Sequence, residues 1–173
     1  MSSIRKPPLT RGITLIELLI VIAVLAILAV LGIPSFQNLI RDNRVTAQSN
    51  ELSALISYAR STASKGASTI VLTITTNGAA WQAVVEEKHC DSAGTCVVVQ
   101  ELRDIDFQNV AMDSSGSSFP LEIRFNNRGI LTDGQIDLSL QHVPCAGQRQ
   151  RRELDVLISG AVRSRNEACS TEE

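Results

Sequence analysis

The chain has 173 residues and a formal charge of −2, so it suits one ordinary domain plus an appendage and does not bind nucleic acid through bulk positive charge. Aromatic residues make up 3% of it and it has two histidines. This composition argues against an aromatic platform for stacked bases and leaves little material for a metal centre or for histidine-dependent catalysis. The mean hydropathy of +0.10 is slightly high for a soluble protein.

The apolar excess is concentrated near the N-terminus. Residues 13–33 read ITLIELLIVIAVLAILAVLGI, in which only Thr14 and Glu17 are strongly polar. At 1.5 Å per residue this segment spans about 30 Å, the thickness of the hydrocarbon core of a bilayer. Three basic residues and no acidic residue precede it, so we expect the N-terminus to stay in the cytoplasm and the rest of the chain to cross the membrane. The pattern predicts an N-terminal signal anchor.

After this span the helical pattern continues. Pro34 removes one backbone donor, so we expect a kink or a weakened turn there. Apolar residues then recur at steps of three and four from Phe36 to Ala63, which predicts a helix that runs to about Ser64. Lys65-Gly66 marks its expected end.

Beyond Gly66 the pattern changes to short runs rich in β-branched residues, with a strong hairpin signal at Asn77-Gly78. The runs predict about six strands: Thr69–Thr75, Trp81–Glu86, Val97–Leu102, Leu121–Phe125, Ile136–Leu140 and Leu154–Ser159. The predicted fold class is α+β. A long N-terminal helix, transmembrane in its first half and amphipathic in its second, packs on a small C-terminal antiparallel β head.

Four cysteines lie in the head and allow three pairings. Cys90 and Cys96 bracket a tight turn-like loop, and Cys145 and Cys169 bracket the last predicted strand, so sequence proximity favours these two pairs. The expected orientation places the head in an oxidising periplasm, which favours disulfides over free thiols. No C-x-x-C motif is present, and we predict neither a metal site nor a cofactor.

The stretch from Arg11 to Ile22 closely resembles the class III signal of type IV pilins and pseudopilins, in which a basic leader ending in glycine precedes an apolar helix with glutamate at its fifth mature position. The resemblance implies that a prepilin peptidase cleaves between Gly12 and Ile13. Ile13, where the family usually has phenylalanine, becomes an N-methylated mature N-terminus, and Glu17 becomes the fifth residue. Pro34 falls where pilins commonly carry a proline.

Glu17 is the residue that a plain signal anchor does not explain, because a carboxylate inside a membrane is costly without a partner. The resemblance implies that the α-amine of Ile13 in one subunit pairs with Glu17 of its neighbour inside the filament, which selects the register of the subunits. A pair between Glu17 and the amine of its own chain is the alternative.

The segments 34–44 and 58–61 resemble the minor-pilin branch that contains FimT, FimU and the H-type pseudopilins of type II secretion. Residues 125–129 and 151–163 resemble the FimT/H-type head, with its F-x-x-x-G turn and its final G-R-x-R ending. In FimT-type pilins that ending is implicated in binding DNA for natural transformation. Here Ala161 replaces the first arginine of the motif, and Arg163 matches the second.

Five arginines at this end of the chain are therefore candidates for a local phosphate-binding patch: Arg149, Arg151, Arg152, Arg163 and Arg165. Acidic residues are interleaved with them, and a solvated charged face around the last strand is the competing interpretation.

Together these features predict a filament protein and not an enzyme, because no catalytic motif is present. The predicted organisation is a cleaved leader (1–12), a membrane and filament-core helix (13–33), an amphipathic helix (34–65) and a periplasmic head (66–173). The expected function is that of a FimT/FimU-like minor pilin of the inner membrane that joins other pilin subunits, helps to initiate or cap a type IV pilus, and binds double-stranded DNA. An H-type pseudopilin of type II secretion is the alternative, and a membrane-anchored periplasmic enzyme is a more distant one.

Overall fold

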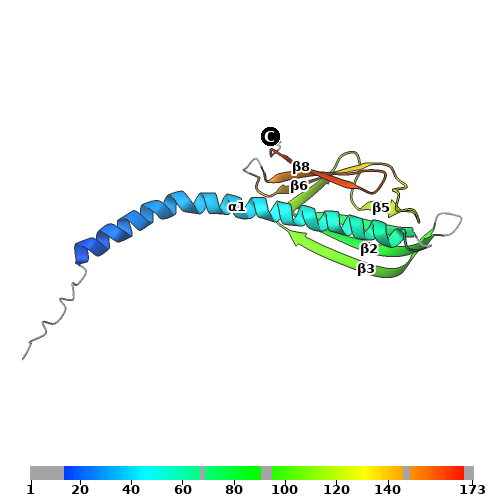
Figure 1. Ribbon diagram of the computed structural model, residues 1–173, viewed down its shortest axis with the longest axis horizontal. Helices are drawn as coiled ribbons and strands as arrows, with labels where there is room; N and C mark the ends of the chain where they lie inside the picture. Colours follow the sequence, from blue (N-terminus) through cyan, green and yellow to red (C-terminus); the bar gives the residue numbers. More distant parts are fainter. Residues whose placement is uncertain (1–13, 67–68, 91–94, 146–148, 170–173) are drawn as a thin grey trace, which may run out of the picture. The chain divides into compact units, whose positions relative to one another are not determined.

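The computed structural model describes residues 14–66, 69–90, 95–145 and 149–169. Within these ranges one helix is followed by eight strands (Figure 1). Helix α1 runs from Leu15 to Ala63, and the strands are β1 (Thr69–Asn77), β2 (Ala80–Cys90), β3 (Cys96–Gln108), β4 (Val110–Ser114), β5 (Leu121–Phe125), β6 (Ile136–His142), β7 (Arg151–Val156) and β8 (Val162–Glu167). The predicted α+β class is confirmed, with α1 packed on antiparallel sheets.

Helix α1 is unbroken across Pro34, so the interruption expected there does not end the helix. The chain divides into two compact units, residues 1–37 and residues 38–173, and α1 contributes to both. The second unit contains all eight strands, and its strand-bearing part, residues 66–173, is called the head below.

The head has two four-stranded antiparallel sheets. The first has the strand order β3-β2-β1-β5 and the second the order β4-β6-β7-β8. The predicted hairpin is confirmed, because β1 pairs with β2 up to Asn77 and Ala80, and Gly78 in the turn has a φ of +61° that suits glycine. The division of the strands into two sheets has no counterpart in the predicted elements.

Two strands, β4 and β8, were not predicted from the sequence. The sequence of β8, VRSRNE, did not predict a strand because Val162 is its only apolar residue, so it has no alternation of apolar and polar side chains. Strand β4 is short and lies directly after β3. The last predicted strand, 154–159, shares only residues 154–156 with β7. The backbone turns after Val156 and leads into β8.

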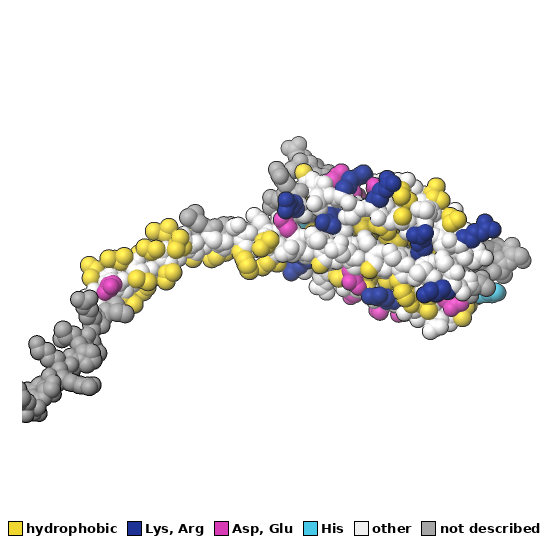
Figure 2. Space-filling view, in the orientation of Figure 1, with side chains coloured by type: hydrophobic (Ala, Val, Ile, Leu, Met, Phe, Trp, Pro, Cys, Tyr) yellow, Lys and Arg dark blue, Asp and Glu magenta, His cyan; other side chains and the backbone are white. Residues whose placement is uncertain are grey.

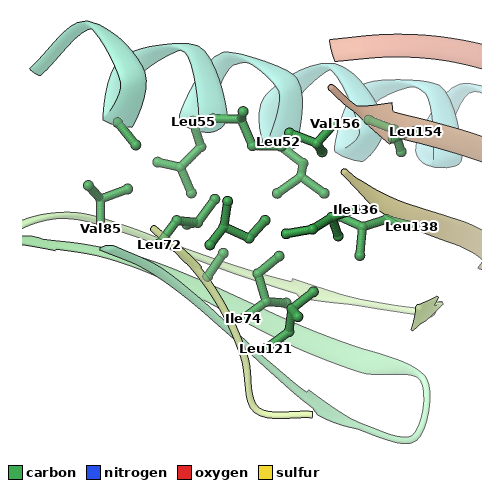
Figure 3. Close-up of a cluster of buried hydrophobic side chains, with 14 of the residues drawn as sticks. Leu52, Leu55, Leu72, Ile74, Val85, Leu121, Ile136, Leu138, Leu154 and Val156 are labelled. Atoms are coloured by element: carbon green, nitrogen blue, oxygen red, sulfur yellow. The ribbon is translucent and has the colours of Figure 1, made fainter. Parts of the chain in front are cut away.

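The hydrophobic core lies between the second half of α1 and both sheets. Leu52, Leu55, Ile56, Ala59 and Ala63 of α1 are buried at the predicted three- and four-residue spacing. In Figure 3 the side chains of Leu52 and Leu55 point from the helix toward labelled side chains of both sheets, namely Leu72, Ile74, Val85 and Leu121 of the first and Ile136, Leu138, Leu154 and Val156 of the second.

A buried polar link also joins α1 to the first sheet. The Trp81 indole N–H donates to Gln48 Oε1 at 3.0 Å, and Gln48 Nε2 donates to the Gln108 carbonyl at 3.1 Å. The Trp81 ring packs on Phe107 with a centroid separation of 4.8 Å. Gln48 therefore satisfies the one polar group of the buried tryptophan and fixes the helix against β2 and β3.

Candidate functional site

The N-terminal end of α1 is capped by Thr14. The Glu17 backbone N–H donates to Thr14 Oγ1 at 3.3 Å, and the Leu18 N–H donates to the Thr14 carbonyl at 3.2 Å. Glu17 lies in the first helical turn, where the helix dipole favours a negative charge, and its side chain is exposed. Gly12 and Ile13, the predicted cleavage pair, lie outside the described residues.

The first half of α1 is an uncovered apolar surface. The structure has one helix long and apolar enough to cross a membrane, and the apolar window of this helix is not buried by any other part of the described chain. Large apolar side chains from Leu15 to Ile33 are exposed by about half or more of their area, and Figure 2 shows this surface as yellow with little interruption. A surface of this kind requires lipid or other protein around it.

The five C-terminal arginines lie on or beside the β7–β8 hairpin. Arg149 precedes β7, Arg151 and Arg152 begin it, and Arg163 and Arg165 lie on β8. The cross-strand register does not bring the arginines together as one patch, because three of them have acidic residues as their partners. Arg165 lies opposite Glu153, Arg163 opposite Asp155, and Arg151 opposite Glu167, as is typical of a solvated face of alternating charge.

Arg165 is the most strongly compensated of the five. Its guanidinium lies 2.9 Å from Glu153, 3.3 Å from Asp155 and 3.9 Å from Glu167. The hydrogen bond from Arg165 lowers the pKa of Glu153, while a hydrogen bond with Glu153 raises the pKa of Glu167. Three carboxylates of the same hairpin therefore balance the positive charge of Arg165.

The other four arginines differ in their environment. Arg151 lies 3.8 Å from Glu153, and Arg152 donates to Ser164 at 3.3 Å. Arg149 and Arg163 are exposed, and within the described residues neither forms an ion pair. The five arginines therefore differ in whether a carboxylate lies close to them. The sequence alone does not show this difference, because it depends on the cross-strand register.

A disulfide closes this end of the head. Cys145 and Cys169 are bonded, with their Cα atoms 5.8 Å apart, so this predicted pair is confirmed. Cys96 also takes part in a disulfide. Its predicted partner, Cys90, has a side chain outside the described ones, although the β2–β3 register pairs the backbones of these two residues. That pairing stays a prediction.

Three segments that are far apart in the chain meet at Arg60 in the last turn of α1. Gly129 has a φ of +68°, and a Cβ atom there would lie 3.0 Å from Arg60 Cγ and 2.6 Å from Ser64 Oγ. Gly160 has a φ of +74°, and a Cβ atom there would lie 2.7 Å from Arg60 Cδ and 2.9 Å from the Gly129 carbonyl oxygen. The Arg60 side chain therefore runs over two glycine backbones that need both the left-handed conformation and the absence of a side chain.

Hydrogen bonds also join the two glycine-containing turns to each other and stabilise the 126–130 turn itself. The Leu131 N–H donates to the Ile158 carbonyl at 2.9 Å, and the Asn126 side chain accepts the N–H groups of Arg128 and Ile130 at 2.9 and 3.1 Å. The glycines of the F-x-x-x-G and G-R-x-R-like motifs thus have a structural role at the end of the helix. The sequence contained each motif but no sign that they meet, because Gly129 and Gly160 lie 66 and 97 residues after Ala63, the last residue of α1.

No group of three or more metal-binding side chains occurs in the described ranges. What the described chain presents is an exposed apolar helix, a β head closed by a disulfide and a close packing of three segments at the end of α1. Its class is that of proteins with an N-terminal apolar helix long enough to cross a membrane and a β head.

Comparison with family models identifies the class further. The type II transport protein GspH model matches residues 48–161, which is more than half of the chain, and the prokaryotic N-terminal methylation motif matches residues 9–33. The chain belongs to the GspH family, within the type IV pilin and pseudopilin superfamily. No curated protein and no solved structure gives a significant match. Proteins of this superfamily are structural subunits that assemble with other pilins after processing by a prepilin peptidase.

Proposed function

We propose that this chain is a minor pilin that enters a type IV pilus through α1 and helps to initiate or cap the filament. The observation that carries the proposal is the uncovered apolar half of α1 behind an N-terminal methylation motif. In this proposal a peptidase removes residues 1–12, residues 13–33 span the inner membrane and later the filament core, residues 34–65 continue the helix, and residues 66–173 form a periplasmic head.

Glu17 supplies the test of assembly. Its carboxylate would pair with the mature α-amine of Ile13 in the neighbouring subunit, and without that pair a charge would remain uncompensated in an apolar bundle. We expect Glu17→Ala to leave cleavage and membrane insertion unchanged and to reduce recovery of the subunit in filaments sheared from the cell surface. Glu51→Ala, which removes a carboxylate from the head half of α1, is the matched control. Normal incorporation of Glu17→Ala would contradict the proposed role.

The alternative system is type II secretion, as an H-type pseudopilin. The GspH family match supports membership in either system. Deletion of the gene separates them, because loss of pili with normal secretion of exoproteins supports the pilus, and the reverse outcome supports the pseudopilus.

A second candidate function is DNA binding at the C-terminal end of the head. It is favoured by Arg149 and Arg163, which are exposed and outside ion pairs in the described residues, and it is opposed by the compensation of Arg165. Binding of this kind would be independent of sequence and strongly dependent on salt. We expect the mature protein in neutral detergent to shift duplex DNA at low salt, and Arg163→Ala to weaken the shift. An unchanged shift would exclude Arg163 as a contact.

A further inference from the structure

The junction at the end of α1 has an unusual charge composition. It is built from residues 58–66, 126–131 and 157–163, which together contain four basic residues and not one acidic residue. The chain as a whole has 18 acidic against 16 basic residues, so this local excess is opposite in sign to the overall balance. The four basic residues, called the junction cluster here, are Arg60, Lys65, Arg128 and Arg163.

Close packing of the three segments brings the cluster together. The Cβ position of Gly129 lies 2.6 Å from Ser64 Oγ, so the residues next in the chain, Arg128 and Lys65, project from adjoining backbones. Arg60 lies across Gly129 and Gly160. Arg163 follows three residues after Gly160, at the start of β8.

No described carboxylate forms an ion pair with these four side chains, and Asp155, which the β7–β8 register places opposite Arg163, pairs with Arg165 instead. All four side chains are exposed, and none forms an ion pair with a described acidic residue. Arg124 and Arg165, by contrast, each contact two or more carboxylates. Figure 2 shows dark-blue and magenta side chains side by side over β8.

We propose that the junction cluster is the surface through which the head contacts the phosphate backbone of duplex DNA. This inference rests on the DNA-binding candidate of the preceding section and moves most of the contact from the C-terminal arginines to the end of α1. Uncompensated basic side chains are what phosphate contact requires, because an arginine already paired with carboxylates must give up those pairs. Exposed Ser61, Asn127 and Ser159 add neutral donors for phosphate oxygens around the cluster.

Two variants with the same change in charge test the assignment. The junction variant carries Lys65→Gln, Arg128→Gln and Arg163→Gln, and it keeps Arg60 because this side chain packs on both glycines. The control variant carries Arg149→Gln, Arg151→Gln and Arg165→Gln. Affinity for a fluorescent duplex is measured by anisotropy with the mature full-length protein in neutral detergent, at salt concentrations from about 50 to 200 mM.

The junction variant should bind at least about tenfold more weakly at low salt, and the slope of log affinity against log salt should fall by about 2 to 3, as expected for the loss of three phosphate contacts. The control variant should stay within about threefold of the unmodified protein, since its arginines are mostly compensated. Equal losses in the two variants, or a larger loss in the control, would overturn the assignment.

Two further measurements test whether the cluster binds phosphate in particular and whether DNA binding is separate from filament assembly. Polyglutamate carries charge without phosphate, so it should displace DNA poorly, and displacement as effective as that by unlabelled DNA would overturn the phosphate assignment. Incorporation into filaments should be unchanged in the junction variant. A protein that enters filaments normally but does not bind DNA would refute this inference and leave the proposed assembly role intact.

Discussion

Gly160, in the β7–β8 turn, packs against both α1 and the 126–130 turn. Its φ of +74° already disfavours any L-residue, and an added Cβ would meet Arg60 Cδ at 2.7 Å and the Gly129 carbonyl at 2.9 Å. We expect Gly160→Ala to lower the free energy of unfolding by about 3 kcal/mol, because the backbone strain and the steric contact add. The midpoint of urea unfolding, followed by the fluorescence of the buried Trp81, measures this change.

Gly134 provides the matched control for this prediction. It also has a positive φ, +92°, but nothing lies within 4 Å of its Cβ position, so Gly134→Ala should cost only the backbone strain, about 1 kcal/mol. Arg60→Ala should recover part of the loss in the Gly160→Ala background, since it removes the side-chain contact but not the one with the Gly129 carbonyl. Equal effects of the two glycine substitutions would show that Arg60 does not pack at Gly160 as described.

Among the elements, the first sheet carries an ion-pair network that links β2 to β5 across β1. Lys88 Nζ lies 3.1 Å from Glu122 Oε1 and 3.3 Å from Glu86, and Arg124 also pairs with Glu122. Partial burial alone would raise the pKa of Glu122, but the hydrogen bonds from Lys88 and Arg124 outweigh it and lower the pKa.

A lowered folded-state pKa makes the contribution of Glu122 dependent on pH. The stabilisation is present above the pKa of an unfolded glutamate, about 4.3, and is lost as the pH falls through the lower folded-state pKa. We expect Glu122→Gln to be less stable than the unmodified head at pH 7, with a difference that shrinks below about pH 4. Urea unfolding across this range is the measurement. A difference that does not change with pH would mean that the network contributes through packing and not through charge. Glu87→Gln on β2, for which no ion pair is described, should show no such trend.

At the scale of the whole molecule, local patterns predicted the helix and the hairpin but not how distant segments combine. The buried positions Leu52 and Leu55 follow from periodicity, and the turn at Gly78 follows from the residues that can adopt it. The meeting of Arg60 with Gly129 and Gly160 depends on packing between segments far apart in the chain, which leaves no local signal. The compensation of Arg165 likewise depends on the β7–β8 register, and a single sequence does not specify it.

The length of α1 leads to a final prediction about assembly. Its 49 residues extend over about 74 Å, whereas a bilayer core accommodates only about 20 of them. Phe36, Leu39 and Ile40 lie beyond such a span, yet their side chains are 64%, 53% and 45% exposed. Water is a poor environment for this apolar group, so we expect neighbouring subunits to cover it in the filament.

Phe36→Ser combined with Leu39→Ser should therefore reduce the amount of this subunit in sheared filaments several-fold while leaving membrane insertion unchanged. Both side chains are exposed in the free subunit, so the unfolding midpoint of the head should also stay unchanged. Ser57→Ala, at an exposed position on the head half of the same helix, is the control for substitutions in α1 as such. Full incorporation of the double variant would show that this apolar group is not an assembly surface. A lower unfolding midpoint would show instead that the head itself depends on it, and that the apolar contact is made within one subunit.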